Sequence, residues 1–363
     1  MSHRTFRAPG RVNLIGEHTD YNGGFVMPAA IGFYTTVTAR PRADRKLLLS
    51  SAQFSERFEV SLDEYQPRRN AWCDYPAGTA YVLEKAGYPL QGAELTFTSD
   101  VPIGAGLSSS AALEVSTVLA LSSLSGHTIP NCRLAELCQQ AESDYVGMKC
   151  GIMDQFISIH GVENHAILLD CRSLEYQPVP IPENLRLVIA NSKVKHELTG
   201  SSYNHRRRDC ETAAAFFGKP LLRDVTPGQF AEHADQLTPQ VRKRARHVIG
   251  EIERTEQAAA ALQSGDYRKF GALMYASHES LKTDYEVSCD ELDKLVEAAQ
   301  TVDGVYGSRM TGAGFGGCTI SLVEESAVPA FLERVPVLYE TACGIKPDIY
   351  VCRPVNGAHE VTP

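Results

Sequence analysis

The chain has 363 residues, of which 43% are hydrophobic and 22% are charged, and its formal net charge at pH 7 is −9. These values are typical of a globular protein of about two domains that buries a full hydrophobic core. The acidic balance argues against a protein that binds nucleic acid independently of sequence, because such proteins need a basic surface.

The cysteines and the N-terminal residues indicate in which cellular compartment the protein is expected. Ten cysteines are present, and none of them forms a Cys-x-x-Cys pair, so the sequence gives no support to a zinc ribbon or a thioredoxin-like site. The first residues lack an apolar secretory core, and no stretch approaches about 18 uninterrupted apolar residues. We therefore expect a cytoplasmic protein with reduced thiols, and a monomer that binds neither a membrane nor nucleic acid.

Short alternating runs of apolar and polar residues over 4–60 predict several strands. The segment 108–124 is so apolar that we expect a helix buried on most sides. In chain order, the further elements predicted in this half are helices at 74–87 and 133–147 and strands at 93–98 and 165–170.

A proline-rich stretch, Pro178–Pro182, is the expected domain boundary. Helical patterns dominate 201–302, with breaks at Gly265 and 287–288. The remaining predicted elements are strands at 185–190, 305–310, 318–323 and 347–352 and a helix at 326–341. Separate runs of strands and helices predict an α+β architecture in two domains, residues 1–182 and 183–363.

The loop Gly104–Ser110, GAGLSSS, has the features of a phosphate-binding site. Glycines let backbone N–H groups approach a phosphate closely, and the start of the following helix adds unpaired donors and a positive dipole. The loop is not a Walker A motif, because no Gly-Lys-Ser/Thr follows the glycines. Taken alone, it is equally typical of an ordinary helix start with serine caps.

Three other blocks accompany this loop: PGRVNLIGEHTDYNGG at 9–24, CGIMDQF at 150–156 and SRMTGAGFGGC at 308–318. In this order and spacing, they resemble the motifs of the small-molecule kinase superfamily named for galactokinase, homoserine kinase, mevalonate kinase and phosphomevalonate kinase. The first block is similar to the galactokinase family in particular. The resemblance implies a two-domain kinase fold with the active site in the interdomain cleft. It also implies that ATP, with Mg²⁺, phosphorylates the C1 hydroxyl of galactose.

The resemblance assigns the ATP-binding and metal-binding residues. Mg²⁺ prefers hard oxygen ligands, and Ser110 and Glu142 are the candidates, although the three loop serines are chemically indistinguishable in sequence. Trp72 and Tyr75 match a Trp-x-x-Tyr that lies near the adenine in the family, with core packing as the alternative. The expected phosphate-binding residues are Gly104, Gly106, Leu107, Ser108, Ser109 and Ser110.

Asp154 lies in an apolar run, where a lone carboxylate is costly to bury and therefore needs a partner or a task. The resemblance implies that it is the general base, or an electrostatic anchor, for the anomeric hydroxyl, with Arg11 as its counter-ion. The residues expected to bind the sugar hydroxyls are Glu17, His18, Asp20, Gly151 and Tyr203. Without the resemblance, the first three would indicate a turn with solvated acids.

Two alternatives stay open. The chain could be a related sugar 1-kinase, such as one acting on N-acetylgalactosamine, or a non-catalytic sensor of galactose and ATP. Such sensors resemble the enzyme but lack a Ser-Ala pair in the phosphate loop. Here Ser110-Ala111 and Asp154 are both present, which favours an enzyme.

Overall fold

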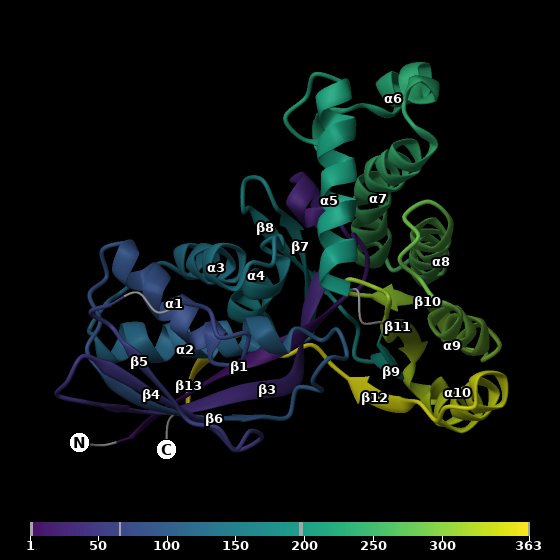
Figure 1. Ribbon diagram of the computed structural model, residues 1–363. Coiled ribbons are helices and arrows are strands. Elements are labelled where there is room, and N and C mark those ends of the chain that lie inside the picture. Colours follow the sequence, from purple (N-terminus) through teal and green to yellow (C-terminus); the bar gives the residue numbers. More distant parts are fainter. Residues whose placement is uncertain (1–2, 65–66, 196–198, 362–363) are drawn as a thin grey trace.

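The computed structural model describes residues 3–64, 67–195 and 199–361, and it confirms the predicted α+β architecture. Figure 1 shows two halves, each a sheet covered by helices. The first half is built on a six-stranded sheet in the order β13-β1-β3-β6-β4-β5. Its strands are β1 (Arg4–Asn13), β3 (Pro28–Pro41), β4 (Lys46–Ser51), β5 (Phe58–Ser61), β6 (Ala93–Ser99) and β13 (His359–Val361).

Four helices cover one face of this sheet. They are α1 (Asp74–Lys85), α2 (Ser109–Leu124), α3 (Asn131–Gln140) and α4 (Met153–His160). The helices α2 and α4 pack directly on β1 and β3, while α1 packs on α2, and α3 packs on both α2 and α4. As predicted, α2 is buried on most sides, and most of its buried residues are apolar, although Glu114, Ser116, Thr117 and Ser122 are buried as well. The layer thus fixes the N-terminal end of α2 beside the end of β1.

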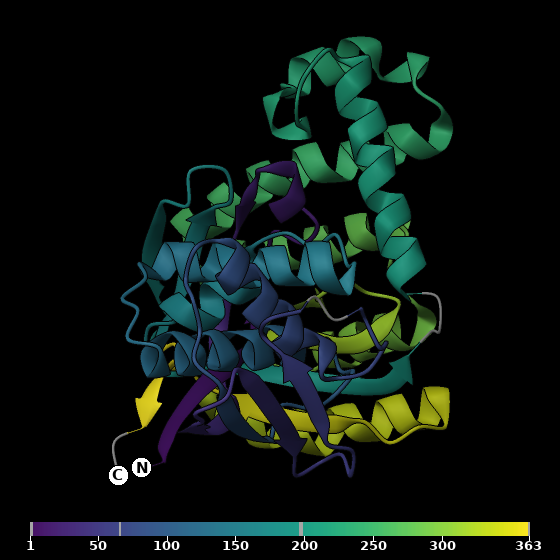
Figure 2. The same cartoon turned by 60° about the vertical axis from the view of Figure 1, so that its left-hand side comes forward.

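The second half has a four-stranded antiparallel sheet in the order β10-β11-β9-β12. Its strands are β9 (Leu185–Lys195), β10 (Val305–Thr311), β11 (Gly316–Glu324) and β12 (Asp348–Cys352). Its helices are α5 (Thr199–Phe216), α6 (Pro227–His233), α7 (Pro239–Gln263), α8 (Tyr267–Thr283), α9 (Asp290–Gln300) and α10 (Val328–Cys343). Figure 2 shows α5 rising away from both sheets, with α6 near its far end. None of the helices in the described ranges is long and apolar enough to cross a membrane.

A small third sheet, β2-β7-β8, adjoins the first half. It comprises β2 (Phe25–Val26), β7 (His165–Asp170) and β8 (Tyr176–Pro180). Part of the proline-rich stretch expected as a boundary is therefore a strand. Prolines are tolerated there because β8 is an edge strand, where a proline that lacks an N–H can face solvent without removing a hydrogen bond between strands. The division of the chain at residue 182 stays a prediction.

Three other expectations need correction. The helix predicted over 133–147 ends at Gln140 and continues as one π-helical turn, Ala141–Val146, closed by Gly147 at φ 89°. The run 201–302 has two further breaks, at 217–226 and 234–238, in addition to the two predicted. The strand β13 was not predicted. It pairs antiparallel with β1, so the described ends of the chain lie side by side in Figure 1.

The helix α8 packs on β10 through direct backbone contact. A Cβ atom added at Gly271 would lie 1.8 Å from the carbonyl oxygen of Tyr306, and one added at Gly307 would lie 2.6 Å from the Cα of Gly271. No side chain fits between the two backbones. This contact sets the distance of α8 from the strand that leads into the 308–318 block.

We predict that Gly271→Ala lowers the free energy of unfolding by about 1–3 kcal/mol, because the new methyl group overpacks this contact. The control is Gly250→Ala on α7, where the added Cβ would meet the end of the flexible Arg254 side chain at 3.0 Å. There the higher helix propensity of alanine should leave stability unchanged or raise it. Urea unfolding followed by circular dichroism measures both, and equal stabilities would contradict the packing argument.

Candidate active site

One cavity of about 610 Å³ contains all the residues that the sequence predicted for the site. They come from β1 and the segment after it, the α1 and α2 starts, the π-helical turn, the α4 start and α5. Cys150, Met153, Gly312 and Ala313, from two of the blocks singled out in the sequence, also line the cavity. The lining residues that the sequence analysis missed are Thr35, Ser51, Gln53, Phe54, Phe97, Ser99, Ile103, Leu113 and Met148. Most of these have no distinctive local pattern, because strand ends and loops carry them to the cavity.

Arg11 and Asp154 form a two-pronged ion pair on the wall of this cavity. Arg11 Nε donates to Asp154 Oδ1 at 2.8 Å, and Arg11 Nη2 donates to Asp154 Oδ2 at 2.7 Å. The third nitrogen, Nη1, donates to the carbonyl oxygen of Gly106 at 2.6 Å, and the Ser108 hydroxyl donates to Asp154 Oδ2. Arg11 is 5% exposed, so these contacts are largely shielded from water. The pair therefore joins β1, the phosphate loop and α4.

The loop Gly104–Ser110 has two glycines in the left-handed region of the backbone. Gly104 and Gly106 have φ values of 74° and 78°, and α2 begins at Ser109, so its first turn borders the cavity. The late glycine loop supports it, because a Cβ added at Gly312 would lie 3.0 Å from the Gly106 oxygen. The two loops thus pack backbone to backbone, and the helix start is left open to an anion.

Glu142 is a buried carboxylate beside the phosphate loop. It is 4% exposed, and it lies in the π-helical turn that sequence periodicity did not predict. Its carboxylate accepts hydrogen bonds from Gln155 Nε2 at 2.7 Å, from the Cys150 thiol at 3.4 Å and from the Ser110 hydroxyl. Burial, followed by the nearby charge of Asp154, raises the pKa of Glu142 to about 7.

The oxygens of Glu142 and Ser110 suit a hard cation such as Mg²⁺. In the part of the chain that is described, no group of three or more His, Cys, Asp or Glu side chains is arranged to hold a metal ion. Mg²⁺ commonly binds through one or two carboxylates together with waters and substrate phosphates, so a pair of protein oxygens is compatible with it.

The residues predicted to bind sugar hydroxyls line the same cavity. Burial, followed by the charge of Asp154, raises the pKa of Asp20 to about 7. A Cβ added at Gly151 would lie 2.0 Å from Asp20 Oδ2, so a side chain there would displace this carboxyl. The Tyr203 ring lies 5.4 Å from the ring of His18. Two acids, an imidazole and a phenol thus surround a space next to Asp154.

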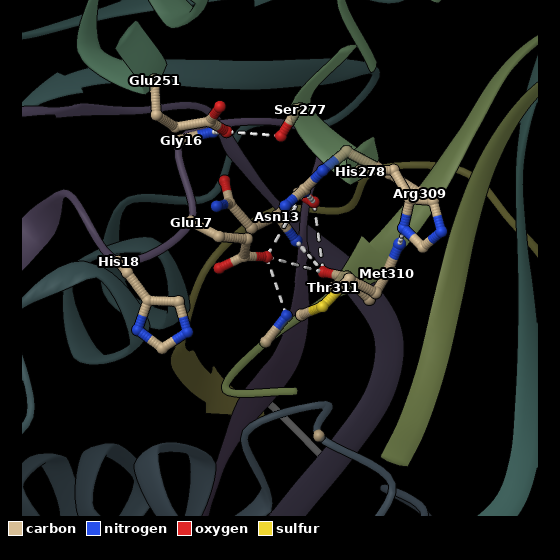
Figure 3. A network of polar contacts seen from close by, with 12 residues as sticks. Asn13, Gly16, Glu17, His18, Glu251, Ser277, His278, Arg309, Met310 and Thr311 are labelled. Atoms are coloured by element: carbon tan, nitrogen blue, oxygen red, sulfur yellow. Dashed lines mark hydrogen bonds and ion pairs between the residues drawn. The ribbon is translucent and has the colours of Figure 1, made fainter. Parts of the chain in front are cut away.

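Glu17 is held from the second half of the molecule (Figure 3). Its Oε1 accepts hydrogen bonds from Gly312 N at 2.7 Å and from the Thr311 hydroxyl at 3.3 Å, and it lies 3.4 Å from Arg309 Nη1. Arg309 is fully buried, and the same Nη1 donates to the Asn13 carbonyl at 2.9 Å. One Glu17 oxygen is therefore committed to the protein, and its other oxygen is the one that a ligand would use.

A second buried carboxylate fixes the start of the same motif. Glu251 on α7 accepts hydrogen bonds from Gly16 N at 3.0 Å and from the Ser277 hydroxyl at 2.5 Å (Figure 3). It also accepts one from Arg254 Nε at 2.8 Å. Burial alone would raise its pKa, but the charge of Arg254 and these donors outweigh burial and hold the pKa at about 2. Glu251 is therefore a charged group that ties α7 and α8 to the sugar-binding motif.

The far end of the cavity is aromatic. Trp72 stacks on Phe54 with the ring planes 14° apart, and Phe97 meets it edge-on. Within the described residues, the buried Trp72 Nε1 has no hydrogen-bond partner. Tyr75 lines the same end. These rings make this part of the cavity lining aromatic and apolar, which suits a planar heterocycle such as adenine.

Comparisons with known proteins agree with this geometry. The model for the galactokinase galactose-binding signature matches residues 2–41, and the N-terminal and C-terminal models of GHMP kinases match 74–162 and 258–340. A galactokinase from Roseiflexus sp. (strain RS-1) is 47% identical over 364 residues, covering 99% of this chain and 93% of that protein.

Solved structures give the same result. The crystal structure of Lactococcus lactis galactokinase complexed with galactose has a TM-score of 0.96 and 40% identity, and the match covers 99% of this chain and 95% of that one. Methanococcus jannaschii mevalonate kinase, at a TM-score of 0.68 and 20% identity over 98% and 99% of the two chains, shows the shared fold. The chain belongs to the GHMP kinase family. Within that family it falls in the galactokinase group, and the protein is an ATP-dependent sugar kinase.

We predict that Glu251→Gln lowers the free energy of unfolding at pH 7 by about 3 kcal/mol. This is the free energy that corresponds to lowering the pKa of the carboxyl group from 4.5 in the unfolded chain to about 2 in the folded protein. A depressed carboxyl pKa stabilises the fold above the unfolded pKa. The difference between variant and wild type should therefore shrink as pH falls from about 4.5 towards 2.

The matched control is Glu253→Gln, an exposed position on the same helix, which should change stability by less than about 0.5 kcal/mol. Denaturant unfolding at several pH values measures both variants. A Glu251→Gln deficit that persists unchanged at pH 2–3 would show that shape, and not charge, gives this residue its effect.

Proposed function

We propose that the protein transfers the γ-phosphoryl group of ATP to the C1 hydroxyl of galactose, giving galactose 1-phosphate and ADP. The observation that carries this proposal is the position of the Arg11–Asp154 pair. It lies between the phosphate loop, which it contacts at Gly106 and Ser108, and the acids of the sugar-binding motif. A hydroxyl held beside Asp154 therefore faces the place where the loop would hold a phosphate.

ATP would bind with its adenine in the aromatic slot of Trp72 and Tyr75 and its phosphates at the start of α2. There the loop glycines and the first backbone N–H groups of the helix act as donors. Ser110 and Glu142 would hold Mg²⁺, which when bound neutralises charge on the transferring phosphoryl group. The Glu142–Gln155 and Glu142–Cys150 hydrogen bonds orient this carboxylate towards the loop.

The sugar would bind in the same cavity. Asp20 and the free oxygen of Glu17 are acceptors for sugar hydroxyls, and Tyr203 offers a phenol that can donate or accept. Gly151 leaves the room that Asp20 occupies. A site built from hydrogen-bonding groups discriminates strongly between sugars, because a missing or misplaced hydroxyl leaves one of these groups unpaired.

Asp154 would orient the C1 hydroxyl and take its proton onto a carboxylate oxygen as the new O–P bond forms. Phosphoryl transfer commonly has a loose transition state, so placement and charge contribute more than early deprotonation. Arg11 contributes to both placement and charge. Its planar guanidinium group fixes the two carboxylate oxygens of Asp154, and its positive charge faces the phosphate loop.

We also propose a cytoplasmic location. In support, all ten cysteines are free, as expected for a reducing compartment. The monomeric state stays a prediction.

A coupled assay of ADP release with galactose, glucose and N-acetylgalactosamine at matched concentrations tests the proposed substrate. We expect galactose to give the highest kcat/KM, because the two acids and the phenol fix the position of several hydroxyls at once. A higher kcat/KM with N-acetylgalactosamine would instead identify the related sugar 1-kinase. Sugar and ATP binding without turnover would identify a sensor.

We predict that Asp154→Asn lowers kcat by at least about a hundredfold while galactose and ATP still bind, because the change keeps shape but removes charge and proton acceptance. Asp144→Asn, at an exposed position of the π-helical turn, is the control and should leave kcat unchanged. A pH–rate profile separates the two roles of Asp154. A true base gives kcat an acidic limb that is missing from the residual activity of the variant, whereas near-normal kcat would refute the assignment.

A further inference from the structure

A chain of polar side chains leads from the second half of the molecule to the sugar-binding motif. The Tyr21 hydroxyl lies 2.8 Å from His18 Nδ1 and 2.7 Å from the Tyr285 hydroxyl. The Tyr285 hydroxyl in turn lies 3.2 Å from the Cys210 sulfur. Tyr285 is fully buried just after α8, and Cys210 on α5 is 1% exposed. We call these four side chains the His18 relay.

Each hydrogen bond of the His18 relay has one possible direction. His18 Nε2 lies 3.2 Å from the Ala313 carbonyl oxygen, which can only accept, so Nε2 carries a proton. Burial, followed by the charge of a second histidine nearby, lowers the pKa of His18 to about 3, so the neutral ring must accept at Nδ1. Tyr21 therefore donates to His18, Tyr285 donates to Tyr21, and the Cys210 thiol donates to Tyr285.

The relay holds a residue whose backbone is strained. His18 has a φ of 64°, in the left-handed region that residues other than glycine rarely adopt. Its ring packs 4.7 Å from the Tyr285 ring, which lies 4.5 Å from the ring of His247 on α7. His247 Nε2 donates to the Glu17 carbonyl at 3.1 Å. The second half thus fixes both the backbone and the ring of the residue between two sugar-binding acids.

Both ring nitrogens of His18 are used within the protein, so the ring contributes to the cavity wall by its shape and position. We propose that Tyr285, acting through Tyr21, is a positioning residue for sugar recognition, because it orients the Tyr21 hydroxyl that holds the His18 ring in place. This inference rests on the proposed function, since it concerns the same sugar site. It adds residues that have no atom on the cavity wall.

Galactose binding in a double-mutant cycle tests the relay. Tyr21→Phe and Tyr285→Phe should each raise the KM for galactose about fivefold or more, because a buried partner loses its donor. The KM for ATP should stay within about twofold. Since the two hydroxyls act in series, the double variant should be no worse than Tyr21→Phe alone. The control is Tyr339→Phe on α10, which removes a buried hydroxyl that donates to the Ser192 carbonyl at 2.9 Å. This variant should not change the KM for galactose.

Nitrogen chemical shifts of the His18 ring give a readout that does not depend on turnover. We expect protonated Nε2 and unprotonated Nδ1 in the wild type. In Tyr21→Phe, Nε2 should stay protonated because the Ala313 carbonyl still accepts from it, whereas the Nδ1 signal should shift because that nitrogen loses its hydrogen bond. An Nδ1–H tautomer in the wild type, an unchanged KM for galactose in both variants, or additive effects in the double variant would overturn the relay. If the wild type does not phosphorylate galactose, the proposed substrate is wrong, while the ring shifts still decide whether the relay exists.

Discussion

The site depends on one buried guanidinium. Arg11 is nearly inaccessible to water, and a buried charge of this kind is tolerated only when it is fully paired. Its partners are Asp154 at the start of α4 and the Gly106 carbonyl in the phosphate loop. The fold must therefore bring β1, the loop and α4 to one point. The same contacts that satisfy the charge place the carboxylate of Asp154, the proposed catalytic group, beside the loop that we propose binds phosphate.

The second half of the molecule acts on the sugar wall through buried charges. Arg309 and Glu17 are both almost fully buried, and removing either one takes from the other its nearest opposite charge, 3.4 Å away. Glu251 holds Gly16 in the same way from α7. The contacts that hold the two halves together are thus also the contacts that position the motif expected to bind the sugar. A change that loosens the packing between the halves should therefore also disturb that motif.

Much of this could be predicted from sequence, and for physical reasons. Strong periodicity revealed the main strands and helices, and β7 lies where it was predicted, at 165–170. The motif residues could be found because the long, unusual blocks that contain them resemble a known family; without that resemblance, Glu17, His18 and Asp20 indicate only a turn with solvated acids. The sequence did not reveal the π-helical turn at Glu142, since a wider turn shifts the apolar spacing that defines a helix. It also did not reveal Tyr285, which looks like an ordinary core residue because its partners are distant in the chain.

The central claim is that one cavity holds a sugar C1 hydroxyl against the phosphate loop, with Asp154 between them. The phosphorus NMR spectrum of the product formed from galactose, ATP and Mg²⁺ tests this claim most directly. The account predicts a sugar phosphate whose phosphorus couples to the anomeric proton, formed together with an equal amount of ADP. A phosphate on another carbon of the sugar, or ADP and inorganic phosphate without a sugar phosphate, would contradict it.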